Sequence, residues 1–212
     1  LVQQINDLSG KNNNATQTNS GDRFNWNISS STLNNYSHLS NSDTSRFMNL
    51  TNGLSLSASS VDDTGFCMTV VMKINTTDTF RLFESSTTDD FIGEFSYNET
   101  TNHCNWTHSG STNSVTSNGS TAESSYNLGD WAIFSFFITV NGTSLSSFIN
   151  NVNNQNTNIT TNVFRNLDRI LFGGNIDVAE FTLYNKPHKS NDDNFVGINL
   201  EVSRLMTKYN IT

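Results

Sequence analysis

Residues 131–140 (WAIFSFFITV) constrain the fold more than any other part of this sequence. The run is well short of the roughly 20 apolar residues that a membrane-spanning helix requires, so membrane insertion is not expected. Its aromatic and β-branched residues favour a strand in the middle of a sheet. Asn141-Gly142 follows directly and is typical of a tight hairpin turn. Residues 144–150 are therefore predicted to return as the partner strand of an antiparallel sheet.

Strand signals continue along most of the chain. Two alternating stretches, residues 79–84 and 91–97, flank an Asp-Asp turn and predict a second hairpin. Further strands are predicted at residues 65–74, 169–173 and 176–184. Three polar stretches lack a clear period: residues 17–41 stay unassigned, and residues 109–125 and 150–162 are interpreted as loops.

The C-terminal region has a different period. Phe195, Ile198, Val202, Leu205 and Tyr209 recur at spacings of three and four, which is one face of an amphipathic helix. Ser190 and the acidic residues after it are typical of a helix start. A helix beginning near Ser190 is predicted to pack on the sheets.

Length and charge restrict the domain count and the partners. The 212 residues contain no linker, and we expect one domain spanning residues 1–212. Because the chain starts at Leu1, we expect that a targeting segment was removed or that this is a piece of a longer protein. Net charge is -8 with eleven scattered basic residues, which excludes nucleic acid and disfavours anionic membranes. Neutral partners, such as sugars or protein surfaces, remain open.

The polar surface is unusual because charged residues are only 14% of the chain, against about 25% in ordinary soluble proteins. Asn, Ser and Thr take their place and create eleven N-x-S/T sequons, although chance would supply about nine in such a composition. We predict N-linked glycans on several of these sites, on turns and strand ends. The sequons begin at Asn14, Asn27, Asn35, Asn49, Asn75, Asn98, Asn105, Asn118, Asn141, Asn158 and Asn210.

The two cysteines, Cys67 and Cys104, leave two interpretations. A disulfide would fit the oxidising compartment in which sequons are modified. Two unpaired buried thiols are the alternative. The sequons favour the disulfide, which is the prediction made here.

Three stretches together resemble the concanavalin A-like lectin/glucanase superfamily in its laminin G-like branch. Asp7-Leu8-Ser9-Gly10 with the Asn-rich run after it is similar to that branch's opening motif, and Gly174 to Tyr184-Asn185 is similar to its late strand. Leu205 to Thr212 is similar to the tail of its closing helix, with Asn210 in place of the usual glycine. The resemblance implies an all-β, two-sheet antiparallel jelly-roll sandwich with one C-terminal amphipathic helix.

The resemblance also makes glycoside hydrolysis a possible activity, but the residues at the matching positions disfavour it. Glucanases of this superfamily carry E-x-D-x-x-E, whose paired carboxylates act as nucleophile and acid/base. Here the strand has Asn175, Asp177 and Glu180, and an amide cannot form the glycosyl ester. We therefore predict no enzymatic activity and structural roles for Asp177 and Glu180.

Metal and ligand sites are less well marked. Calcium is a possible cofactor that the resemblance implies, with Asp62, Asp63, Asp89 and Asp90 as ligands in turns. His103, Cys104 and His108 lack the fourth ligand of a zinc site.

Among the tryptophans, Trp106 and Trp26 lie in polar segments and are the candidates for stacking on a sugar, whereas Trp131 is expected in the core. The sequence thus predicts an extracellular, cell-surface or virion-surface module for carbohydrate binding or adhesion. The alternatives are a structural subunit of an assembly that binds protein neighbours and, third, a divergent glycosidase-like domain.

Overall fold

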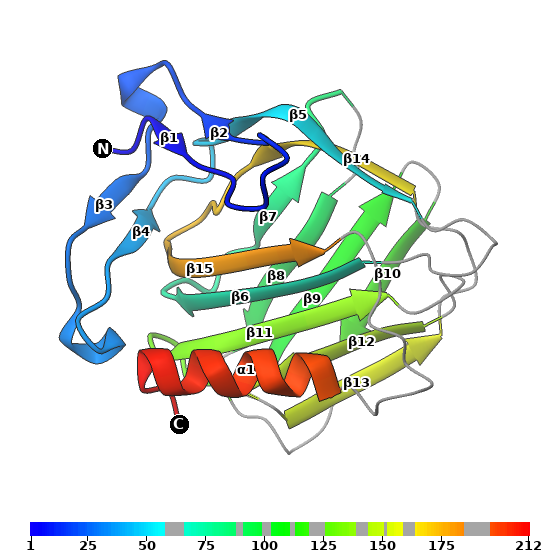
Figure 1. Cartoon of the computed structure of the whole chain (residues 1–212). Coiled ribbons are helices and arrows are strands. Elements are labelled where there is room, and N and C mark those ends of the chain that lie inside the picture. The colour runs from blue at the N-terminus through cyan, green and yellow to red at the C-terminus, as the bar shows by residue number, and fades with distance from the viewer. Residues whose placement is uncertain are drawn as a thin grey trace.

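A computed structural model describes residues 1–57, 66–87, 91–98, 103–110, 113–118, 126–138, 144–150, 152–158, 164–184 and 196–212 (Figure 1). Its strands form two antiparallel sheets with one α-helix at the C-terminus, which confirms the predicted β-sandwich class. Within these residues no helix is long and apolar enough to cross a membrane.

One sheet has seven described strands with the apolar segment near its centre, as the sequence predicted. β6 lies between β11 and β15, because its own apolar residues suit a position with a neighbour on both sides. In spatial order the strands are β13 (Val152–Asn158), β12 (Ser144–Ile149), β11 (Trp131–Ile138), β6 (Phe66–Ile74), β15 (Ile176–Tyr184), β4 (His38–Asn41) and β3 (Asn25–Asn27).

The second sheet has eight described strands and packs behind the first in the view of Figure 1. Its β7–β8 pair is the predicted second hairpin. In spatial order the strands are β1 (Gln4–Ile5), β2 (Ala15–Thr16), β5 (Met48–Ser57), β14 (Phe164–Ile170), β7 (Phe80–Glu84), β8 (Phe91–Asn98), β9 (His103–Gly110) and β10 (Asn113–Asn118). Two short 3-10 helices, η1 (Ser20–Asp22) and η2 (Ser31–Leu33), interrupt the N-terminal strands.

Side chains along β6 point alternately to the two faces of its sheet, so the buried residues form two layers, one on each face. Met68, Val70 and Met72 face the other sheet and belong to the main core. Cys67 and Val71 face the opposite way and pack in a second cluster with residues of the helix. We call the side of the seven-stranded sheet that carries Cys67 and Val71 its outer face.

Helix α1 (Val196–Tyr209) covers part of this outer face. Val202, Leu205 and Tyr209 are buried there, as their spacing predicted. Asn210 closes the helix at φ 55°, and the Ile211 amide donates to the Met206 carbonyl at 3.0 Å. This is the closure that glycine usually makes, and asparagine is the usual substitute. The predicted start near Ser190 lies outside the described residues.

Two of the motifs that carry the family resemblance have structural explanations. The Asp7 carboxylate accepts the Ser9 and Asn13 amides at 2.8 and 3.0 Å, which closes the first loop. Gly174 has a φ of 95°, and a Cβ there would lie 2.7 Å from the Phe80 Cβ, so a side chain does not fit.

Two of the predicted loops are wrong. Residues 109–125 include β10, and residues 150–162 include β13. Each strand forms the edge of a sheet, paired on one side only among the described strands. Both segments consist mainly of Ser, Thr and Asn, so neither shows the apolar alternation by which a strand is recognised. Residues 17–41, left unassigned, contribute β3, β4 and both 3-10 helices.

Candidate functional site

The edge strand β3 presents Trp26 to solvent. β3 pairs with β4 on one side, and the Trp26 side chain is 51% exposed. Asn25 beside it and Ile28 after it are exposed as well. Strand β3 therefore displays a large aromatic ring to solvent, and we call residues 25–28 the β3 edge.

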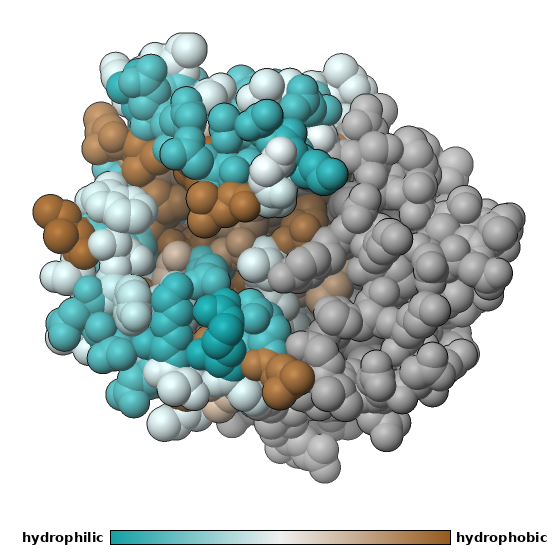
Figure 2. All heavy atoms as spheres, viewed as in Figure 1, coloured by the Kyte–Doolittle hydropathy of each residue, from teal (hydrophilic) through white to brown (hydrophobic). Residues whose placement is uncertain are grey.

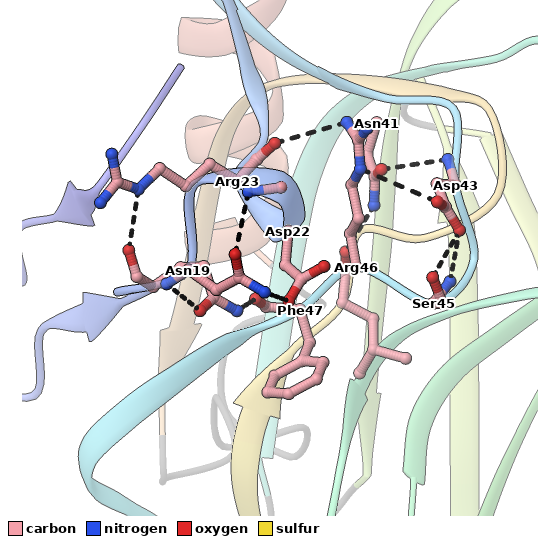
Figure 3. Close-up of polar contacts among 11 residues, drawn as sticks. Asn19, Asp22, Arg23, Asn41, Asp43, Ser45, Arg46 and Phe47 are labelled. Carbon is pink, nitrogen blue, oxygen red and sulfur yellow. Dashed lines mark hydrogen bonds and ion pairs between the residues drawn. The ribbon is translucent and has the colours of Figure 1, made fainter.

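The chain before Trp26 is held by a polar cluster that Figure 3 shows. The Arg23 guanidinium donates to the Gln17 carbonyl through Nε at 3.0 Å and to the Thr18 carbonyl through Nη2 at 3.0 Å. The Arg23 carbonyl accepts from Arg46 Nη1 at 3.4 Å. The first two bonds hold residues 17–23 together, and the third ties Arg23 to the β4–β5 turn, so the backbone that leads into Trp26 is held in place.

Two buried amides complete this cluster (Figure 3). Asn41 donates to the Leu171 carbonyl at 3.1 Å and accepts the Asp43 amide at 3.1 Å. Gln17 donates to the Phe47 carbonyl at 2.8 Å and accepts the Asn19 amide at 3.0 Å. Buried polar groups are tolerated when they are hydrogen-bonded, so the cluster is a scaffold for loops rather than a ligand site.

A row of polar residues crosses the outer face next to the helix. Register places Trp131 opposite Lys73, Lys73 opposite Asp177, and Asp177 opposite Ser40. The Lys73 ammonium also lies 5.5 Å from the centre of the Trp131 ring. Trp131 is only 8% exposed because residues of η2, α1 and the C-terminus cover it, which confirms its predicted place in the core.

His38 lies beside this row and contacts Trp131 edge to face, with ring centres 5.3 Å apart. Burial lowers the pKa of His38; Asp177 opposes this effect and Lys73 adds to it. The imidazole is therefore neutral at neutral pH. Its Nδ1 has no hydrogen-bond partner among the described residues.

Asp177 and Glu180 have the structural roles that the sequence predicted. Asp177 pairs with Lys73 at 2.7 Å. Glu180 accepts from Lys208 at 2.6 Å, from the Tyr209 hydroxyl at 2.7 Å and from Arg204 at 2.9 Å, which fastens the helix to β15. Asn175 lies in the turn before β15 and donates to the Asn75 carbonyl at 3.1 Å. Each group that would have to act on a glycosidic bond is engaged in holding the fold.

The predicted disulfide is wrong in this structure, because Cys67 is a free, buried thiol. Cys67 lies on the outer face of the seven-stranded sheet, whereas Cys104 belongs to β9 of the other sheet. The main core separates these two layers, so a bond between the cysteines would require the sandwich to come apart. Burial raises the pKa of Cys67 to about 12.

The other predicted residues are dispersed. Trp106 lies in β9, in the opposite sheet from Trp26, so the structure does not bring the two candidate tryptophans into one sheet. The four aspartates proposed for calcium, Asp62, Asp63, Asp89 and Asp90, lie outside the described residues. Within the described part of the chain, no three His, Cys, Asp or Glu side chains are grouped as metal ligands.

The sequons fall at different depths. Asn35, Asn49 and Asn210 are exposed, while Asn14, Asn27 and Asn75 are half-buried. Asn98, Asn118 and Asn158 are the last residues of β8, β10 and β13, and Asn105 lies within β9. Asn141 lies outside the described residues.

Sequence reasoning missed His38 and Lys73. Lys73 is a cation inside an otherwise apolar strand, and such a residue needs a partner when the strand is buried. That pattern could have pointed to the matching carboxylate, Asp177. His38 carries no comparable signal, because its strand is only four residues long.

Comparisons with known proteins agree with the fold. No family model matches the sequence, and no curated protein is significantly similar to it. Among solved structures, the botulinum neurotoxin serotype D binding domain matches with a TM-score of 0.55 and 14% identity, over 96% of this chain and 50% of that one. The chain thus spans about half the length of that domain.

Two smaller proteins also match. A heptameric SAP-like pentraxin from Limulus polyphemus matches with a TM-score of 0.54 and 9% identity, over 71% of this chain and 76% of that one. Domain 4 of the extracellular arabinanase AbnA from Geobacillus stearothermophilus, solved with arabinotriose, matches with a TM-score of 0.51 and 15% identity, over 89% of this chain and 83% of that one. At such low identity these likenesses show a shared two-sheet β-sandwich fold.

Proposed function

We propose that this chain is a non-enzymatic carbohydrate-binding or adhesion module of the laminin G-like kind, working outside cells or on a cell or virion surface. The exposed Trp26 at the β3 edge is the observation that carries the proposal. An indole ring presents a flat apolar face that can pack on the C–H face of a sugar. The arabinotriose complex of the arabinanase domain supports this assignment by analogy of fold alone.

Charge and chemistry support a neutral ligand. Net charge is -8, and the described basic side chains of the β3 region, Arg23 and Arg46, are engaged in holding loops. The absence of catalysis is supported by Asn175, which stands where a carboxylate nucleophile would be needed, and by the ion pairs of Asp177 and Glu180.

The experiment measures binding of the full chain to an immobilised panel of neutral glycans. We expect Trp26→Ala to weaken binding to any glycan that the wild type holds by at least about tenfold, equivalent to about 1.4 kcal/mol. Trp26→Phe keeps an aromatic face and should retain part of the affinity. Leu200→Ser is the matched control, because it removes an exposed apolar side chain of α1 that lies outside the β3 edge.

The result that would overturn the proposal is binding that survives Trp26→Ala, or the absence of binding across the panel. Because Trp26 is half-exposed on an edge strand, its replacement should leave the unfolding midpoint nearly unchanged. Binding loss would then report the site rather than the fold. Release of reducing sugar by the wild type would restore the glycosidase alternative.

A second candidate is a structural subunit of an extracellular assembly that binds protein neighbours. Apolar side chains that are only partly buried against the main core favour it: Val2, Ile5, Leu50, Phe181 and Leu183. A surface of this kind is typical of contact with another polypeptide.

A further inference from the structure

Strand β15 is paired unequally on its two sides. β6 pairs with it from Ile176 to Tyr184, but β4 pairs with it only at Ile176, Asp177 and Val178. Within the described residues, the main chain of residues 179–184 has no strand on the β4 side. The chain of β4 leaves this position at its N-terminal end, where residues 30–37 turn away to form η2.

The space beside this free edge is hollow and apolar. Figure 2 shows a depression with apolar atoms on its floor, bordered by polar atoms above it and over α1 below it. In Figure 1 the same region lies between β15 and the N-terminal strands β1, β2 and β5. Half-buried apolar side chains are contributed by these elements: Val2 before β1, Ile5 in β1, Leu50 in β5, and Phe181 and Leu183 in β15.

We propose that residues 179–184 of β15 form a docking edge for an extended segment of another polypeptide, which adds to the seven-stranded sheet as a further strand. Two observations select this occupant. Unpaired main-chain groups along a strand are matched by the main chain of another strand. The apolar floor beside them matches apolar side chains at every second position of that segment, because strand side chains alternate between faces.

The depression beside residues 179–184 argues against a second folded copy of this chain as the occupant. Two sheets that join edge to edge need exposed, protruding edges. Here the free edge lies beside a depression, and the loop that contains Leu8 borders the same region, with Leu8 94% exposed. A slender segment can enter such a recess, whereas the edge of another sandwich would meet its borders first.

The geometry sets the length and pattern of the partner. Among the described residues, the six from 179 to 184 have no strand on the β4 side, which corresponds to about 20 Å of extended chain. Phe181 already packs against Phe83 and Phe172 with ring centres 5.8 and 5.1 Å away, so the floor is formed before a partner binds. The surface is distinct from the β3 edge and does not depend on sugar binding.

The test uses a fluorescein-labelled peptide of sequence Lys-Thr-Val-Thr-Val-Thr-Val-Lys and the wild-type chain. We expect saturable binding in fluorescence anisotropy, together with slowed amide exchange confined to residues 179–184 and their strand neighbours. The same peptide with its central Val replaced by Pro lacks one main-chain donor and breaks the strand. Its dissociation constant should be at least tenfold higher.

A protein variant separates the edge from the rest of the surface. Leu183→Lys places a charge over the apolar floor and should weaken binding at least tenfold, while Leu200→Lys on the exposed side of α1 should not. If Leu183→Lys fails to fold, the amide exchange measurement on the wild type still tests whether the peptide binds at residues 179–184. No saturable binding at millimolar peptide, equal affinity for the proline peptide, or protection located elsewhere would overturn the proposal. A dimer that buries residues 179–184 would overturn the choice of occupant.

Discussion

Lys73 and Asp177 face each other across β6 and β15, with Nζ 2.7 Å from Oδ2. Asn75 Nδ2 lies 3.3 Å from the same oxygen, and the ammonium of Lys73 approaches the Trp131 ring. Both side chains of the pair are largely buried. The pair therefore joins the two strands and supports the tryptophan that the helix covers.

Removing one member of this pair should cost more than removing an exposed lysine. We expect Lys73→Met to lower the free energy of unfolding by about 3 kcal/mol, because it leaves Asp177 without its cation. The double variant Lys73→Met/Asp177→Asn should recover part of the loss. Urea denaturation measures both, with Lys11→Met at an exposed position as control. Equal stability of the two lysine variants would contradict the prediction.

Glu180 should make helix docking sensitive to acid. Burial disfavours its charge, but hydrogen bonds from Lys208, Tyr209 and Arg204 outweigh burial and hold the pKa of Glu180 below its ordinary 4.5. A carboxyl whose pKa is lowered by folding stabilises the protein above its unfolded pKa. That contribution is lost as the pH falls through the folded pKa.

The wild type should therefore lose more stability than Glu180→Gln between about pH 6 and about pH 3. Thermal unfolding across this range measures the difference. Asp78→Asn, at an exposed position, is the control and should follow the wild type. A constant gap between the wild type and Glu180→Gln at all pH values would show that the carboxylate acts only through its shape.

Cys67 should behave as an inert buried thiol. With its pKa at about 12 through burial, the thiolate is scarce at neutral pH and the sulfur is shielded. We expect no alkylation of Cys67 by iodoacetamide in the native protein and complete alkylation in urea, read by peptide mass. Dithiothreitol should leave the unfolding midpoint unchanged. A fall in the midpoint under reduction would instead show that a disulfide stabilises the fold.

Glycan occupancy should follow exposure when the chain is secreted from eukaryotic cells. Asn35, Asn49 and Asn210 are exposed, whereas the Nδ2 atoms of Asn27 and Asn75 donate to Ser40 and Asp177. We expect higher occupancy at the three exposed sites. Enzymatic deglycosylation converts each occupied Asn to Asp, and peptide mapping then locates the sites. Preferential occupancy of Asn27 and Asn75, or no occupancy at all, would contradict this prediction.

The sequence by itself determined the elements whose local pattern matches their environment. Buried strands and amphipathic helices have a regular spacing of apolar residues that can be read from the sequence. This spacing predicted the apolar face of the helix and the strands β6, β7, β8, β11, β12 and β15. Trp131 was placed in the core because it leads the most apolar strand, and Asp177 and Glu180 received structural roles because Asn175 stands where a nucleophile would be needed. Polar edge strands such as β10 and β13 were missed because their sequences, rich in Ser, Thr and Asn, lack apolar alternation.

Only the tertiary structure decided which groups meet. The sequence alone allowed a disulfide between Cys67 and Cys104. In the structure, the alternation of side chains along β6 turns Cys67 toward the helix, whereas β9, which contains Cys104, lies on the other side of the main core. The Lys73–Asp177 pair, the buried His38 and the free edge of β15 likewise depend on the order of strands in a sheet. Contacts between strands far apart in sequence depend on register and sheet order, and a local pattern carries neither.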